Sequence, residues 1–249
     1  MYVDHPTFIP PQNADQKIWR YLDFTKFVDL LNSSSLFFAR ADYFDDVFEG
    51  SISKETLLKR SMRFEQMIKD GVLNERYTPE FMNDLNQKTK KEMAINCWHI
   101  NDHESAAMWK LYLKSNEGVA IQSTFNRLIK SFSRTSISVN IGVVNYIDYE
   151  TDFIPYGNAF APYIHKRKNF EHEKELRCII SGIGYQNKKL INLDKGGAHV
   201  DVQLSHLIEN IFVSPDSPQW VIDLTRDITK KYDVNCPIIN SKLKDSPLF

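Results

Sequence analysis

The sequence contains little that points to a disulfide framework, a zinc site or a membrane. Its 249 residues include only three cysteines, Cys97, Cys178 and Cys236, which are isolated from one another. No CxxC pair or His-Cys cluster accompanies them, so we expect buried free thiols. No apolar run approaches the roughly 20 residues that cross a bilayer, and the first residues lack the basic and apolar segments of a secretory signal. We therefore expect a cytoplasmic protein with no membrane partner.

An excess of one charge and the common nucleotide fingerprints are also missing. The chain has 31 Lys and Arg against 32 Asp and Glu, so a strong general affinity for nucleic acid is not indicated. The glycine-rich motifs of P-loop and dinucleotide-binding folds are absent, as is the G-x-S-x-G of many hydrolases. Cys97 and His99 make a weak nucleophilic pair, because alternate residues of a strand share a face without needing to react.

The predicted fold is a single α+β domain over residues 1–249. Short strands interrupted by helices, without a regular β-α-β rhythm, predict a mixed, largely antiparallel sheet, whole or split, flanked by helices. Residues 1–16 are polar and proline-punctuated, and we expect a surface arm. Residues 51–92 predict a helical insertion between the second and third strands, which is either a flap over a ligand site or a plain cover for the sheet.

The most informative stretch runs from Phe170 to Ser181. Its alternating pattern predicts a half-buried strand with Leu176, Cys178 and Ile180 on one face and Glu173, Glu175, Arg177 and Ile179 on the other. Same-face residues lie about 6.5–7 Å apart, which lets Arg177 hold Glu175 ionised and leaves Glu173 or Glu175 to face a ligand. The alternative is an exposed edge strand whose charges prevent further pairing. The preceding basic triplet, Lys166 to Lys168, is typical of a solvated helix face.

An acidic, aromatic loop follows the second predicted strand. Asp42, Asp45, Asp46 and Glu49 supply the oxygen ligands that divalent cations prefer. Their spacing matches no calcium loop, and aspartates also cap helices and form turns, so the structural interpretation is favoured over a metal site.

Several motifs in fixed order resemble the bacterial family catalogued as domain of unknown function 2971. The residues that carry the resemblance are Trp19-Arg20-Tyr21, Phe38, Asp45-Asp46-x-Phe48-Glu49, Cys97-Trp98, Met108-Trp109-x-x-Tyr112, Gly118-Val119-Ala120-Ile121 and Phe170-x-x-Glu173-x-Glu175-x-Arg177. Two positions depart from the family pattern, with Asp45-Asp46-Val47 in place of Asn-Asp-Pro and Ser123 in place of an aromatic residue. The resemblance implies a prokaryotic, cytoplasmic protein, and it links the chain to phage defence without an established activity.

A looser resemblance, in the order of elements, is to ADP-ribosyltransferases. An early strand carries a basic residue, a middle strand ends in Gln-Ser-Thr, and a late strand carries Glu-x-Glu. The resemblance implies that Arg20 binds NAD, that Ser123 supports the glutamate, and that Glu175, with Glu173 beside it, stabilises the oxocarbenium-like ribose. NAD is thus the expected cofactor.

These patterns predict one concave site formed by residues from several elements. The expected members are Arg20, Tyr21, Trp98, Met108, Tyr112, Ser123, Lys166, Glu173, Glu175 and Arg177. Three functions remain open. They are an NAD-dependent transferase or glycohydrolase of a defence or toxin-type system, a non-catalytic module that binds a nucleotide or a protein, and a metal-dependent nuclease that uses the acidic loop.

Overall fold

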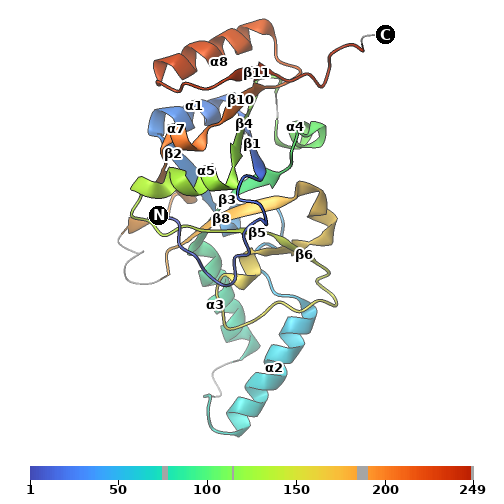
Figure 1. Ribbon diagram of the computed structural model, residues 1–249. Helices are drawn as coiled ribbons and strands as arrows, with labels where there is room; N and C mark the ends of the chain where they lie inside the picture. The colour runs from blue at the N-terminus through green and yellow to red at the C-terminus, as the bar shows by residue number, and fades with distance from the viewer. Residues whose placement is uncertain (75–77, 114, 184–189, 248–249) are drawn as a thin grey trace.

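The computed structural model describes residues 1–74, 78–113, 115–183 and 190–247 (Figure 1). Strands and helices alternate irregularly along the chain, as an α+β fold requires. The strands are β1 (Lys17–Asp23), β2 (Ser35–Arg40), β3 (Met93–Ile100), β4 (Gly118–Thr124), β5 (Asn140–Val143), β6 (Asn145–Ile147), β7 (His165–Arg167), β8 (Glu175–Ser181), β9 (Gly197–Asp201), β10 (Asn210–Val213) and β11 (Ile238–Asn240).

The α-helices are α1 (Phe24–Ser33), α2 (Lys54–Lys69), α3 (Pro79–Lys91), α4 (Ala106–Tyr112), α5 (Phe125–Ser131), α7 (Leu204–Leu207) and α8 (Gln219–Lys231). Short 3-10 helices occur at η1 (Ala41–Tyr43), η2 (Phe132–Arg134), η3 (Ala161–Tyr163) and η4 (Lys168–Glu173). Side-chain caps start several of the helices. For example, Ser53 accepts a hydrogen bond from the backbone N–H of Thr56 at the start of α2.

Nine strands of the described chain form one sheet, in which β10 and β11 run parallel and the other pairs run antiparallel. The order is β11-β10-β4-β1-β3-β2-β9, and β8 lies between β3 and β5. The predicted α+β class with a mixed, largely antiparallel sheet is confirmed.

The sheet splits along one edge of β3. That edge pairs with β2 at Ala94 and Ile95 and with β1 at His99 and Ile100. Between these points β1 and β2 diverge. Two side chains bind backbone groups in the gap: Asn96 donates to the carbonyl of Phe37 (2.8 Å) and Arg20 donates to the carbonyl of Cys97 (2.6 Å). Side chains thus satisfy backbone groups that a continuous sheet would pair.

The two faces of the sheet are packed differently. One face carries the largest core cluster, in which α1 and α5 contribute Phe27 and Leu128 over strand residues such as Leu176. The other face carries two smaller clusters, one around Ile95 and Ile179 and one around Trp19, Tyr21, Met108 and Trp109. The charged residues of β8 share this second face with Ile179.

Strand β8 is an interior strand, which corrects the edge-strand alternative. It pairs with β3 from Glu175 to Ser181 and with β5 on its other side, and all seven of its residues are buried. The predicted alternation holds within these bounds. Glu173, however, lies in η4, and Lys174 follows it with a positive φ of 41°. The strand therefore begins two residues later than the charge row suggests.

The N-terminal residues are tied to the fold more firmly than their composition suggests. Val3 donates a backbone hydrogen bond to Val139, and the Phe8 side chain is buried against the cluster around Ile95. The chain passes so close to β5 that a Cβ on Gly142 would lie 2.9 Å from the Cα of Phe8. Backbone hydrogen bonds and a buried aromatic ring thus anchor the expected surface arm.

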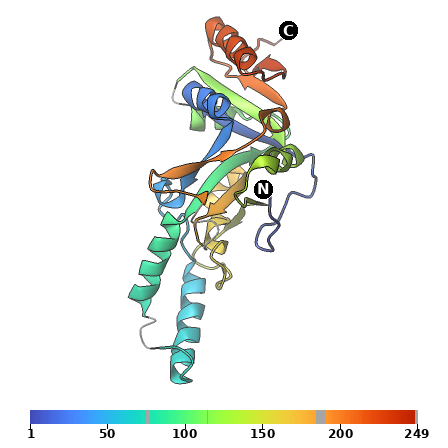
Figure 2. The same ribbon diagram turned by 90° about the vertical axis from the view of Figure 1, so that its left-hand side faces the viewer.

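Helices α2 and α3 follow β2 and precede β3, and both views show them side by side, extending away from the sheet (Figure 2). At the base of α2, Thr56 Oγ1 donates to the carbonyl of Ile154 (2.9 Å), and Lys54 pairs with Glu150 (3.0 Å). Among the described residues, none from α2 or α3 lines the cleft at the split in the sheet. The flap interpretation of residues 51–92 stays a prediction.

Candidate functional site

A cleft of about 680 Å³ opens where the sheet splits. This volume lies within the range of small-molecule sites. Its walls come from β1, α1, β2, the acidic loop after β2, β3, α4 and the segments on either side of η4. Of the predicted site residues, the cleft is lined by Arg20, Tyr21, Trp98, Tyr112, Lys166, Glu173 and Glu175.

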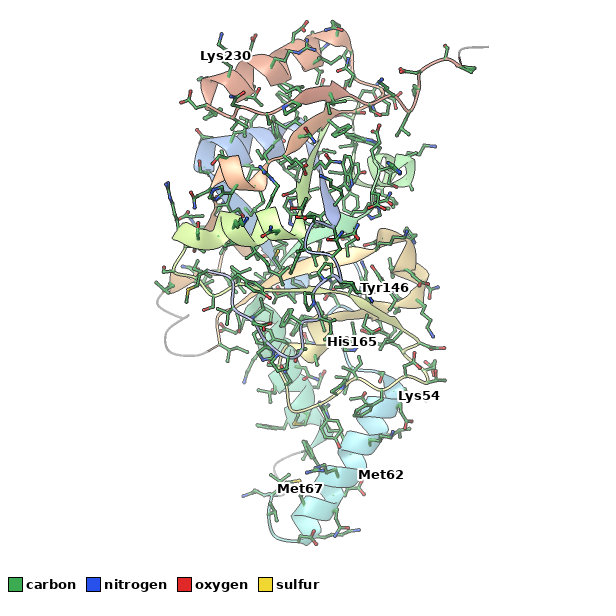
Figure 3. The ribbon with its side chains drawn as sticks, viewed as in Figure 1. Lys54, Met62, Met67, Tyr146, His165 and Lys230 are labelled. Carbon is green, nitrogen blue, oxygen red and sulfur yellow. The ribbon has the colours of Figure 1, made fainter. Side chains whose placement is uncertain are left out.

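Glu175 is the centre of a buried charge network at one end of the cleft. Its Oε2 accepts a hydrogen bond from Arg177 Nε (2.7 Å), and its Oε1 accepts one from Lys166 Nζ (2.5 Å). The backbone N–H of Glu175 donates to the hydroxyl of Tyr146 (2.9 Å), which Figure 3 labels. Although burial opposes ionisation, the nearby Arg177 and Lys166 hold the pKa of Glu175 well below its ordinary value.

Arg177 lies behind Glu175 and does not reach the cleft. Its two terminal nitrogens donate to Glu49 at 2.8 and 2.9 Å, and Nη1 also donates to the carbonyl of Tyr163 (2.7 Å). The side chain is fully buried and its hydrogen-bonding groups are engaged. Arg177 therefore holds Glu175 in place from outside the cleft, although the sequence predicted that it would line the site.

Glu173 differs from Glu175 in its protonation. Its Oε2 accepts from Lys166 (2.7 Å). Burial, together with hydrogen bonding to Glu175, raises the pKa of Glu173 to about 7. With Glu173 protonated, two cations balance two carboxylates, Glu49 and Glu175. Burial also raises the pKa of Glu49, against the opposing effect of Arg177, and Glu173 is a carboxyl of this network whose pKa lies near neutral pH.

Lys166 is buried, which corrects its assignment to a solvated helix face. It lies in the short strand β7, which pairs in parallel with β6. Its ammonium bridges Glu173 and Glu175 and lies 4.7 Å from the centre of the Phe170 ring. The basic triplet does not reveal this burial. In the three-residue strand β7, the side chain of the middle residue, Lys166, points towards the two carboxylates.

Arg20 contributes a cation with no matching carboxylate among the described residues. One terminal nitrogen binds the carbonyl of Cys97, and no ion pair to this guanidinium is found in the part of the chain that the structure describes. Burial lowers the pKa of Arg20, and the ionisable neighbours that act on it are Cys97, Cys178 and Tyr112. A cation in this setting favours an anionic ligand.

The aromatic residues of the cleft play different parts. Tyr112 is 44% exposed and lines the same cleft as Arg20 and Glu173. Trp98 is buried and donates its indole N–H to Asn96 (2.9 Å), which makes it part of the wall. Tyr21 is also buried, and its hydroxyl accepts from the backbone N–H of Ser105 (2.7 Å).

Two further predicted residues, in addition to Arg177, do not line the cleft. Met108 packs with Trp19, Tyr21 and Trp109 in a core cluster beneath α4. Ser123 is buried in β4 and donates its hydroxyl to the carbonyl of Leu207. The structure therefore does not bring Ser123 to Glu175.

His99 is a cleft residue that the site prediction omits. Its Nδ1 lies 2.6 Å from the carbonyl oxygen of Glu173, which can only accept, so Nδ1 carries the proton. The pKa of His99 is lowered by burial, and its Nε2 has no hydrogen-bond partner in the described chain. The register of β3 and β8 places His99 opposite Glu175. The sequence signal for this residue is limited to the alternation that puts His99 and Cys97 on one face of their strand.

The acidic loop does not form a cluster. Asp42 pairs with Arg40 (2.6 Å), Asp46 with Arg167 (2.7 Å) and Glu49 with Arg177. Asp45 lines the cleft next to Asp46. Among the described residues, no group of three or more His, Cys, Asp or Glu side chains is placed to hold a metal ion. The loop acids instead pair with three different arginines.

Comparisons with protein-family models, with curated proteins and with solved structures find no match for this chain. The residues themselves therefore carry the functional argument. No helix in the described part of the chain combines the length and apolar character needed to cross a bilayer.

Proposed function

We propose that the cleft binds a nucleotide of the NAD type and that the protein is an NAD-dependent ADP-ribosyltransferase or glycohydrolase. One observation carries the proposal. The guanidinium of Arg20, which has no ion pair among the described residues, shares a cleft with the carboxylates Glu173 and Glu175, which Lys166 bridges. Such a site complements a ligand with an anionic phosphate at one end and a centre that becomes positive at the other.

The charge network suits cleavage of the bond between ribose and nicotinamide. When that bond breaks, its electron pair stays on nicotinamide, which leaves neutral, and positive charge develops on the ribose. Glu175, fixed by Lys166 and Arg177, stabilises this charge more in the transition state than in the ground state. The oxygen of water, or of an acceptor, then bonds to the ribose carbon, and its proton passes to ionised Glu173.

Binding would use the remaining cleft residues. Arg20 pairs with the pyrophosphate, and the half-exposed ring of Tyr112 offers a surface for a flat base. By the family resemblance, we place the protein in a bacterial phage-defence or toxin-type system. A macromolecular acceptor would bind at the open mouth of the cleft.

Release of nicotinamide from NAD is the test. Glu173→Gln keeps the shape of the side chain and removes the proton acceptor, so turnover should fall by about 10²- to 10⁴-fold. Glu150→Gln, which alters an exposed carboxylate paired with Lys54, is the matched control and should leave turnover unchanged. Equal rates for wild type and Glu173→Gln would contradict the proposal.

A non-catalytic nucleotide-binding module is the second candidate, and one observation favours it. Both carboxylate oxygens of Glu175 already have protein partners, as in a structural ion-pair network. This candidate predicts binding of ADP-ribose without release of nicotinamide from NAD. The catalytic proposal predicts both.

A further inference from the structure

Phe37 is an aromatic residue of the cleft that the proposed chemistry does not use. It lies in β2, lines the cleft and is 41% exposed. Its neighbours Leu36 and Phe38 belong to the main core, so strand alternation places Phe37 on the face of the sheet that carries Glu175. An uncovered aromatic ring in the wall of a cleft is a surface on which a flat ligand can stack.

Neighbouring residues hold the Phe37 ring in one orientation. A Cβ on Gly197 of the paired strand β9 would lie 2.5 Å from the tip of this ring, so the ring occupies space that a side chain at that position would need. The ring of His199 packs edge-on against it, with ring centres 5.2 Å apart. His199 is itself fixed, because its Nδ1 lies 2.7 Å from the hydroxyl of Ser35. A ring fixed in this way loses little freedom when a ligand stacks on it.

Phe37 lies on the opposite side of β3 from the carboxylates. Strands β2 and β8 pair with opposite edges of β3, so the backbones at Phe37 and Glu175 are separated by at least two strand spacings, or about 10 Å. The guanidinium of Arg20 binds the carbonyl of Cys97 at the edge of β3 that faces the gap between β1 and β2, and it therefore lies between them. Across the cleft the order is an aromatic ring, a cation and a carboxylate.

We propose that Phe37 is the stacking platform for the adenine of the bound nucleotide, and that the ligand lies across β3. The adenine then stacks on Phe37, the pyrophosphate pairs with Arg20 and the distal ribose reaches Glu175. This order of groups is that of ADP-ribose, and the ring of Tyr112 remains for the second base of a dinucleotide. The inference rests on the proposed function, because it takes the ligand to be a nucleotide.

Calorimetric titration of ADP-ribose into wild type and Phe37→Leu tests the inference. Leucine keeps an apolar side chain in β2 but removes the flat ring, so the dissociation constant should rise by at least about fivefold. Ribose 5-phosphate, which carries no base, should not distinguish the two proteins in a titration followed by NMR. The matched control is Phe153→Leu, at an aromatic residue that is also 41% exposed and does not line the cleft, and it should bind ADP-ribose as wild type does. Melting curves establish that each variant is folded.

The outcomes separate this inference from the proposed function. If wild type and Phe37→Leu bind ADP-ribose equally, the cleft takes a nucleotide but its adenine lies elsewhere, and the inference is overturned alone. An equal loss of affinity for ADP-ribose and ribose 5-phosphate in Phe37→Leu would also overturn it, because the loss would not depend on the base. If wild type does not bind ADP-ribose, both proposals are overturned.

Discussion

Arg177 Nε donates a 2.7 Å hydrogen bond to Glu175 Oε2, and both side chains are buried two residues apart on an interior strand. The far side of the same guanidinium is held by Glu49. The acidic loop, the strand and the cleft are thus joined through one arginine. Stability and site geometry therefore depend on the same contacts.

Replacing Arg177 with Met should destabilise the fold strongly. The change leaves Glu49 and Glu175 buried without their shared cation, and breaking a buried pair in this way costs about 3–5 kcal/mol. Urea denaturation measures the free energy of unfolding. Arg226→Met, which removes an exposed pair with Asp223, is the control and should cost about 0–1 kcal/mol. Similar losses in both variants would contradict the network.

The pH dependence of stability should show the raised pKa of Glu173. Its pKa moves from an ordinary 4.5 to about 7 in the folded protein. Between these values the folded state holds a proton that the unfolded state releases, so this contribution is complete below about pH 4.5 and is lost as pH rises towards 7. Glu175 acts in the opposite sense, because its lowered pKa makes its contribution disappear as pH falls below 4.5.

Glu173→Gln removes this titration. Its free energy of unfolding should change less between pH 5 and 7 than that of wild type, as measured by denaturant titration at several pH values. A matched curve for Glu209→Gln, which alters a carboxylate paired with Lys17 outside the cleft, should keep the wild-type slope. If the free energy of unfolding changed with pH equally in wild type and Glu173→Gln, the titrating proton would belong to a group other than Glu173.

The sequence predicts the class of fold and the face that carries chemistry, because both depend on local alternation. The pattern from Leu176 to Ile180 specifies which side of β8 is apolar, and Arg177 follows as the partner of Glu175. The pattern does not reveal what lies on either side of the strand. The interior position of β8, between β3 and β5, depends on residues about 35 and 80 positions earlier in the chain.

Some predicted site residues line the cleft and others are buried elsewhere, and the sequence pattern does not distinguish the two groups. Arg20 and Tyr112 reach the cleft, whereas Ser123 follows the alternation of β4 into the main core. Lys166 looks solvated in a basic triplet, yet its partners Glu173 and Glu175 bury it. These outcomes depend on tertiary contacts, which a motif cannot show.

Phe8→Ala should detach the N-terminal arm and destabilise the protein by about 3–5 kcal/mol, because a fully packed aromatic ring is removed from the cluster around Ile95. Hydrogen exchange should accelerate at Val3, whose backbone N–H donates to the carbonyl of Val139, and at Val143, whose backbone N–H donates to the carbonyl of Ile9 in the arm. Ile9→Ala, at a 65% exposed neighbour, is the control and should change little. Unchanged stability in Phe8→Ala would contradict the anchored arm.

Calorimetric titration with ADP-ribose tests the central claim most directly, because the ligand carries the pyrophosphate and ribose without needing turnover. Wild type should bind, and Arg20→Gln, which keeps a donor for the carbonyl of Cys97 but removes the charge, should bind at least about tenfold more weakly at an unchanged melting temperature. Arg127→Gln, at a guanidinium outside the cleft, should bind as wild type does. Equal affinity for wild type and Arg20→Gln, or no binding to either, would contradict a nucleotide site at the split in the sheet.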